Sequence, residues 1–109
     1  MSGLDNTSYT VRTSAVTTTA TQTDSVILIL AATGAVTVNL PAVATVQPGR
    51  SYTIYKDAAA QTITIDPAGS ETVDGGATTT LISGQVHAKT VMTNGTAWFI
   101  VNEYDAAAA

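Results

Sequence analysis

The 109-residue chain has no cysteine, and only 11% of its residues are charged. Without cysteine, neither disulfides nor a thiolate metal site can hold the fold together. Four lysines and arginines stand against eight acidic residues, so the net charge is −4 and no basic patch can form. Because neutralisation of phosphates dominates the affinity of proteins for nucleic acid, we expect no nucleic-acid partner.

Long hydrophobic runs are also missing. The longest one, residues 26–32, is far too short to span a bilayer, so we expect no membrane partner. The first residues lack the basic and apolar regions of a signal peptide, which predicts synthesis in a cytoplasm and no export by that route.

Threonine is abundant instead and makes up about a fifth of the chain. It is β-branched and favoured on half-buried pleated surfaces. No segment keeps apolar residues at helical spacing, whereas short β-rich runs alternate with turn signals every eight to twelve residues or so. The sequence therefore predicts an all-β fold. Its expected strands are residues 8–13, 15–22, 26–31, 35–40, 51–55, 61–66, 78–82, 86–93 and 97–102.

Two hairpins are expected. Asn94-Gly95 favours a two-residue type I′ turn, in which both residues have positive φ. That turn would place Thr93 opposite Thr96 and Val91 opposite Trp98. The second hairpin covers residues 26–40 and turns near Thr33-Gly34, and its first strand is apolar at every position, which predicts burial on both faces.

These elements predict an antiparallel, jelly-roll-like β-sandwich, with a β-prism-like intertwined trimer as the alternative arrangement. We divide the chain into an N-terminal arm (1–14), the β-sandwich domain (15–103) and a C-terminal tail (104–109). The arm is rich in serine, threonine and asparagine and has few apolar groups. Such a segment cannot form a core, but its backbone can add a strand to a neighbour.

The sequence offers little for catalysis. His87 is the only histidine, and no G-x-S-x-G motif accompanies it. A lone histidine close to Lys89 is typical of a solvated strand residue. We therefore predict that the protein is not an enzyme and has no catalytic residues.

Carboxylate pairs and metal patterns are no stronger. A glycosidase needs two carboxyl groups about 5–10 Å apart across a cleft. The pairs Glu71/Asp74 and Glu103/Asp105 fit turn and cap roles better in a domain of this size. The loop at residues 66–76 has oxygen ligands but no EF-hand pattern. We expect no metal and no cofactor.

Apolar side chains on strand faces point to protein contacts instead. In the last strand, Trp98 and Ile100 are expected in the core, with Phe99 and Val101 on the opposite face. Two-faced strands of this kind indicate a subunit interface, so we predict a homo-oligomer, most simply a trimer. The candidate oligomer interface consists of Val26, Leu28, Phe99 and Val101. The candidate partner or subunit contact in the arm consists of Leu4, Tyr9, Val11 and Arg12.

Four blocks of sequence, taken together, resemble a recurrent module of tailed-bacteriophage structural proteins. Residues 34–41 match the pattern G-A-V-T-V-x-L-P, and residues 48–54 match P-G-x-x-Y-x-I. Residues 62–75 match T-I-T-I-x-P-A-G-x-E-T-I-D-G except for Val73, and residues 94–101 match D-G-T-x-W-x-I-I with Asn94 at its first position and valine at its last. The four blocks occur in order over most of the chain.

The resemblance implies a structural protein of the virion without a reaction of its own. A chain of this length favours a capsid decoration (cement) protein, which bridges and stabilises the subunits of the major capsid protein on the capsid surface. Such proteins are commonly trimers. For a decoration protein, the candidate contact in the arm (Leu4, Tyr9, Val11 and Arg12) is a contact with the capsid or with a neighbouring subunit. A tail-fibre or tailspike module that binds host surface glycan is the alternative.

Overall fold

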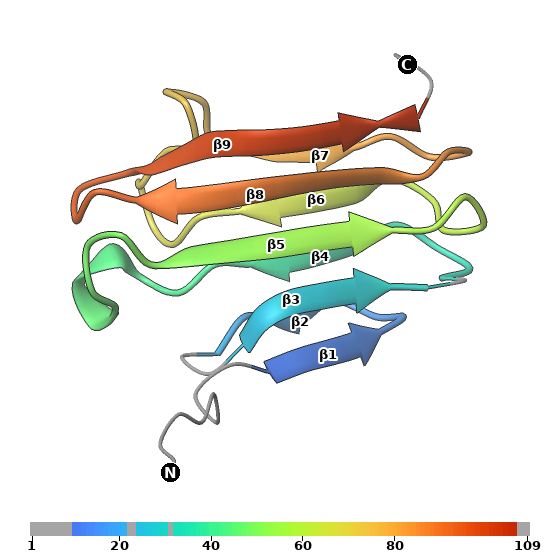
Figure 1. Cartoon of the computed structure of the whole chain (residues 1–109), viewed down its shortest axis with the longest axis horizontal. Helices are drawn as coiled ribbons and strands as arrows, with labels where there is room; N and C mark the ends of the chain where they lie inside the picture. Colours follow the sequence, from blue (N-terminus) through green and yellow to red (C-terminus); the bar gives the residue numbers. More distant parts are fainter. Residues whose placement is uncertain (1–9, 22–23, 31, 107–109) are drawn as a thin grey trace, which may run out of the picture.

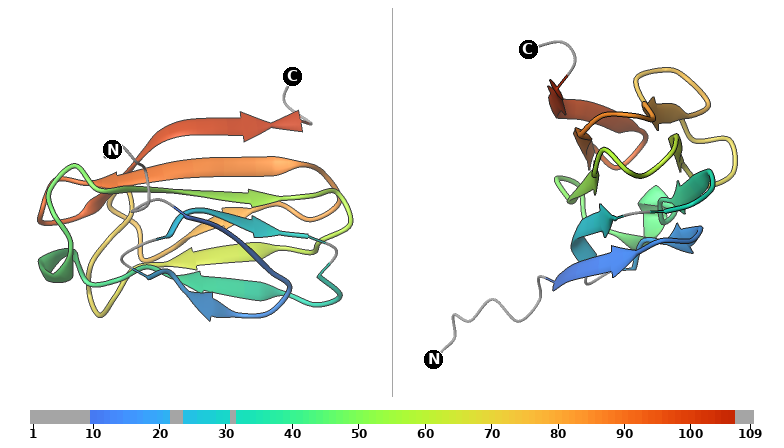
Figure 2. Two further views of the ribbon diagram at one scale, coloured as in Figure 1. Left: turned by 60° about the horizontal axis from the view of Figure 1, so that its bottom comes forward. Right: turned by 90° about the vertical axis from the view of Figure 1, so that its right-hand side faces the viewer.

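The computed structural model describes residues 10–21, 24–30 and 32–106, which form two β-sheets packed face to face. Figure 1 looks onto the outside of the five-stranded sheet, ordered β1-β3-β5-β8-β9, with the four-stranded sheet β2-β4-β6-β7 behind it. The right-hand view in Figure 2 shows the two sheets as separate layers. No helix in the described part of the chain has the length and apolar character needed to cross a membrane.

The nine strands of the described residues are short, and a single 3₁₀ turn, η1 (Val43–Thr45), precedes β5. They are β1 (Thr10–Ser14), β2 (Thr18–Thr19), β3 (Asp24–Ile29), β4 (Val36–Asn39), β5 (Ser51–Lys56), β6 (Ile63–Asp66), β7 (Thr79–Leu81), β8 (His87–Thr93) and β9 (Trp98–Asp105).

The chain crosses from one sheet to the other after each strand from β1 to β5. Each strand therefore lies beside the strand two places earlier, and these pairs are all parallel. Val26 pairs with Thr53 in one sheet and Val36 pairs with Ile63 in the other, so the second turn of this coil repeats after 27 residues. From β6 onward the chain reverses, and the pairs β6–β7, β5–β8 and β8–β9 are antiparallel.

The core lies between the sheets and consists mainly of β-branched side chains. Ile27 and Ile54 are neighbours in the five-stranded sheet, and Val38 and Ile65 are neighbours in the other. All four are completely buried, as is Trp98, whose ring lies 5.8 Å from that of Tyr52. Parallel pairing with inward-facing isoleucine and valine places similar side chains side by side, which packs the core without disulfides.

The all-β prediction is confirmed, and each predicted strand segment overlaps one observed strand. The prediction of antiparallel pairing throughout is wrong, because β1 to β6 pair in parallel. The predicted hairpin over residues 26–40 is also wrong: β3 and β4 belong to different sheets. The strand at 26–31 is buried on its inner face only, at Ile27 and Ile29, while Val26 and Leu28 are half-buried.

The β8–β9 hairpin is confirmed, but its predicted register is wrong. Thr93 pairs with Trp98 and Val91 pairs with Ile100, which makes a four-residue loop. Asn94 does not have positive φ. Its Oδ1 instead accepts hydrogen bonds from the backbone N–H groups of Thr96 (2.9 Å) and Ala97 (3.1 Å), and these bonds hold the longer loop.

Strands extend into both segments that flank the predicted β-sandwich domain. Residues 10–14 were assigned to the arm, yet they form β1 and pair with β3. Tyr104 and Asp105 were assigned to the tail, yet they complete β9, where they pair with Ala88 and His87. The paired strands thus begin at Thr10 and end at Asp105 in the described part of the chain.

We predict that Gly95→Val lowers the free energy of unfolding by about 1–3 kcal/mol. Gly95 has φ +98°, and a Cβ there would lie 3.3 Å from Pro48 Cγ. Gly34→Val is the matched control, because Gly34 has no positive φ and no neighbouring atom lies within 4 Å of the position that its Cβ would take. Denaturant titration measures both variants, and equal stability of Gly95→Val and wild type would contradict the turn geometry.

Candidate functional site

The outer surface of the five-stranded sheet carries side chains from all of its strands and none of the described ones is charged. We call it the neutral face. The strand register defines it, because its members alternate with the buried residues of each strand. The neutral face consists of Val11, Thr13, Val26, Leu28, Ser51, Thr53, Tyr55, Ala88, Thr90, Met92, Phe99, Asn102 and Tyr104.

The side chains of the neutral face form rows across the sheet. One row runs Thr13, Leu28, Tyr55, Ala88, Tyr104, so two tyrosines flank the small side chain of Ala88. Beside the β8–β9 loop, Met92 pairs with Phe99, and each is more than a third exposed. The neutral face is therefore apolar and aromatic toward solvent along β9.

The outer surface of the four-stranded sheet has a different composition. Thr37, Thr64 and Thr80 lie side by side across β4, β6 and β7, and the next row contains Asn39 and Asp66. Hydroxyl and amide groups suit contact with water. The outer surface of the four-stranded sheet is thus typical of a solvated sheet, whereas the neutral face is typical of a protein contact.

Several charged side chains lie at the two ends of the layer between the sheets. The four-stranded sheet has one strand fewer than the five-stranded sheet. At the end of the layer where β5 ends, β8 begins and β9 ends, the inward-facing positions therefore hold polar side chains. Lys56 is completely buried, and its Nζ donates to the carbonyl oxygens of Asp57 (2.8 Å) and Gln85. This burial lowers the pKa of Lys56. Lys89 Nζ donates to Thr79 Oγ1 at 2.6 Å, which ties β8 to the other sheet.

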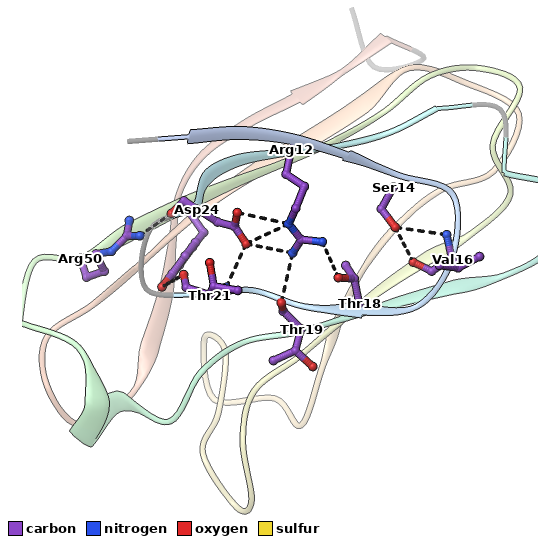
Figure 3. A network of polar contacts seen from close by, with 9 residues as sticks. Arg12, Ser14, Val16, Thr18, Thr19, Thr21, Asp24 and Arg50 are labelled. Atoms are coloured by element: carbon purple, nitrogen blue, oxygen red, sulfur yellow. Dashed lines mark hydrogen bonds and ion pairs between the residues drawn. The ribbon is translucent and has the colours of Figure 1, made fainter. Parts of the chain in front are cut away.

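At the opposite end of the inner layer, Arg12 and Asp24 form a salt bridge that we call the clasp (Figure 3). Arg12 Nη2 lies 2.8 Å from Asp24 Oδ2, and Nε donates to both carboxylate oxygens at 3.2 Å. Arg12 Nη1 also donates to Thr18 Oγ1 at 2.6 Å, which connects β1 with β2 in the other sheet. The clasp thereby closes the first turn of the coil.

Asp24 is only 2% exposed and keeps its charge in the folded protein. Burial raises its pKa, but the hydrogen bonds from Arg12 and from the Thr21 backbone N–H (2.9 Å) outweigh that effect, so the pKa is lowered overall. The carboxylate is therefore a stabilising group only while it is ionised.

His87, Glu103 and Asp105 form one group in the described structure whose ligand atoms are close enough to share a metal ion, all within 4.8 Å. His87 Nδ1 accepts the backbone N–H of Ile82 at 2.9 Å, so the neutral ring carries its hydrogen on Nε2. Nε2 lies 2.7 Å from Glu103 Oε2 and donates to it. A metal would need the Nε2 lone pair and a proton on Nδ1, opposite the Ile82 N–H, so the arrangement fits a hydrogen-bonded lock better than a metal centre.

This lock corrects the sequence interpretation of His87, which is 2% exposed and is not a solvated strand residue. The other carboxylates considered for catalysis also accept backbone hydrogen bonds. The Glu71 carboxylate accepts from the Val43 N–H at 3.2 Å, and Asp74 Oδ1 accepts from the Ile100 N–H at 3.2 Å. These contacts agree with turn and cap roles.

The predicted oligomer-interface residues come together in part. Val26, Leu28 and Phe99 lie on the neutral face. Val101 is 53% exposed but has no partner in β8, because the register shifts between the pairs Val91–Ile100 and Thr90–Asn102. This bulge places Val101 at the margin of the face, next to Phe99.

Of the four predicted arm contacts, the structure describes Val11 and Arg12. Leu4 and Tyr9 lie outside the described residues. Val11 is 66% exposed at the edge of the neutral face, whereas the hydrogen bonds of Arg12 are directed within the chain, into the clasp. Sequence reasoning missed Met92 and Tyr104. Met92 follows the core residue Val91 in β8, and successive side chains of a strand point to opposite faces. This alternation could have placed Met92 on the outer surface from the sequence alone.

Comparison with protein-family models and with curated proteins finds no match to this sequence. The likeness to phage structural proteins therefore depends on the four sequence blocks.

We predict that Asp24→Asn lowers the free energy of unfolding at pH 7 by about 1.5–3 kcal/mol, the contribution of hydrogen bonds to a charged group. The folded pKa of Asp24 lies below its ordinary value of about 3.9, so this contribution is complete above that pH and disappears as the pH falls through the folded pKa. Denaturant titrations at pH 7, 4 and 3 should show the difference from wild type shrinking with acid.

Asp66→Asn, on the outer surface of the four-stranded sheet, is the control and should change stability little at any of these pH values. A constant difference between wild type and Asp24→Asn from pH 7 to pH 3 would contradict the ionised clasp.

Proposed function

We propose that this chain is a structural protein of a virion, a phage capsid decoration protein that bridges and stabilises capsid subunits. The observation that carries the proposal is the neutral face, a sheet surface without charge and partly apolar. Monomeric proteins rarely leave large apolar patches exposed, and those that they do expose mark sites of association. The four sequence blocks that resemble phage structural modules supply the biological setting.

A mechanical role also agrees with how the polar groups are used. The clasp and the His87 lock connect strands of the same domain. Groups that are held in such networks rigidify a fold. We therefore propose that the protein is not an enzyme and that it works as a rigid body on the capsid surface.

The contact with the major capsid protein is proposed at β1 and the residues that precede it. β1 is the edge strand of the five-stranded sheet, so its outer backbone groups are open to strand addition among the described elements. Leu4 and Tyr9 precede this edge, and Val11 lies on it. Main-chain hydrogen bonds need no charge, which suits a chain with few cations.

The oligomer proposed is a trimer of jelly-roll-like sandwich domains, and a β-prism-like intertwined trimer is the alternative. Three copies of a two-layer domain can turn the same sheet toward a common axis. Such an arrangement would bury the same surface in each copy.

A tail-fibre or tailspike module that binds host glycan is the second candidate, and one observation favours it. A shallow hollow of about 110 Å³ on the neutral face is lined by Thr53, Ala88, Thr90, Asn102, Glu103 and Tyr104. An aromatic ring beside hydroxyl and amide groups suits a sugar ring.

We predict that the purified protein binds DNA-filled heads that lack it, saturates at hundreds of copies per head and raises the temperature at which the heads release DNA. Sedimentation of heads with increasing protein measures the binding, and isolated tails are the control. Binding to tails or to host glycan, with no binding to heads, would contradict the decoration role and support the second candidate.

We also predict that deletion of residues 2–9 weakens binding to heads and leaves the domain folded, because the deletion keeps Thr10–Ser14 in β1 and Arg12 in the clasp. Circular dichroism and thermal unfolding test the fold, and cosedimentation tests the binding. A truncated protein that binds heads with full affinity would remove Leu4 and Tyr9 from the contact.

A further inference from the structure

The neutral face is the largest feature that the contacts within one chain leave unexplained. It includes the outer surface of the parallel strands β1, β3 and β5. Val26 and Leu28 on that surface are half-buried by contacts with residues of the same chain. Parallel sheets occur almost only with both faces covered. Here the four-stranded sheet covers one face, and the other has no layer among the described residues.

We propose that the neutral face is covered by the neutral face of another copy of this chain. This inference rests on the proposed function, because it names the partner of that docking surface. It assigns the face to contact between copies, which leaves the β1 edge and the residues before it for the shell.

Charge is the first argument for a second copy. The chain carries a net charge of −4, yet the outward register positions of the five strands hold no charged residue. Glu103 lines the hollow beside Tyr104, but it occupies an inward register position and its Oε2 already lies 2.7 Å from His87 Nε2. Two neutral faces bury no unpaired charge when they meet, so association avoids the main cost of burying a sheet surface.

Shape is the second argument. Sheets pack face to face about 10 Å apart, with their strands nearly aligned. The neutral face offers both projections and hollows for such packing. Phe99 and Tyr104 are 40% and 55% exposed, and the hollow at Ala88 lies beside Tyr104 in the same face. A surface with both kinds of feature can receive a copy of itself.

Area sets the expected strength. Five strands about 4.8 Å apart and about 20 Å long cover on the order of 500 Å². Two such faces bury on the order of 1,000 Å², near the lower limit of specific interfaces. The association of the free protein should therefore be reversible and dependent on concentration.

Light scattering from micromolar to millimolar protein provides the test. We expect the mass to rise from 11.1 kDa to twice that value as concentration increases, because two faces packed on each other close a dimer. A mass of three times that value would support a three-fold arrangement instead and overturn the pairing of two faces. Phe99→Lys and Tyr104→Lys, at exposed positions of the neutral face, should each shift the midpoint of this rise at least tenfold to higher concentration. Thr64→Lys, on the outer surface of the other sheet, is the matched control and should leave the midpoint unchanged.

Cross-linking identifies the surface in contact. Because the chain has no cysteine, Thr90→Cys places a single thiol on the neutral face and Thr64→Cys places one on the opposite surface. A short bismaleimide should join copies of Thr90→Cys and not of Thr64→Cys. Cross-linking through Thr64→Cys instead would assign the contact to the other sheet and overturn the proposal.

A mass of 11.1 kDa at every concentration would also overturn it. The head-binding assay separates this failure from that of the proposed function. A monomer that binds heads keeps the decoration role and makes the shell the occupant of the face. An oligomer that binds no heads keeps the self-contact and removes the decoration role.

Discussion

The alternation of the chain between two sheets is the constraint on which this structure depends. Because β1 to β6 change sheet at every connection, each must pair with a strand one turn of the coil away and in parallel with it. Parallel strands cannot be closed by tight hairpins, so the chain needs longer connections and similar residues at equivalent positions. The stacked isoleucines and valines of the core are the consequence, and the antiparallel strands β7 to β9 then close the C-terminal end.

The ends of this coil require different solutions from its middle. In the middle, Ile27 and Ile54 face the opposite sheet, and apolar burial is sufficient. At the first turn, β2 has only two residues and cannot cover β1, so Arg12 and Asp24 fill the gap with a hydrogen-bonded ion pair. At the other end, β9 extends beyond the smaller sheet, and its inner positions Glu103 and Asp105 pair with His87. Polar networks thus occur where strands of the five-stranded sheet extend beyond the four-stranded sheet that faces them.

The sequence predicted the strands well because turn residues and β-branched runs are local signals. It failed on pairing, since the direction of a strand depends on which distant strand lies beside it. A signal was nevertheless present. Residues 35–41 (AVTVNLP) and 62–68 (TITIDPA) are 27 positions apart and form equivalent strands, β4 and β6. The first turn is shorter, with Val11 beside Val26, so the period is not constant along the chain.

The same reasoning explains what could be predicted about the site. Two-faced strands were visible in the sequence, so Val26, Leu28 and Phe99 could be assigned to a surface before their neighbours were known. The absence of charge on that surface could not, because it depends on the register of five strands and on Lys56, His87 and Lys89 all pointing inward. The register of β5 and β8 directs these three side chains into the layer between the sheets. The uncharged outer surface is the result, and it follows from the register of β5 and β8 and not from the overall composition.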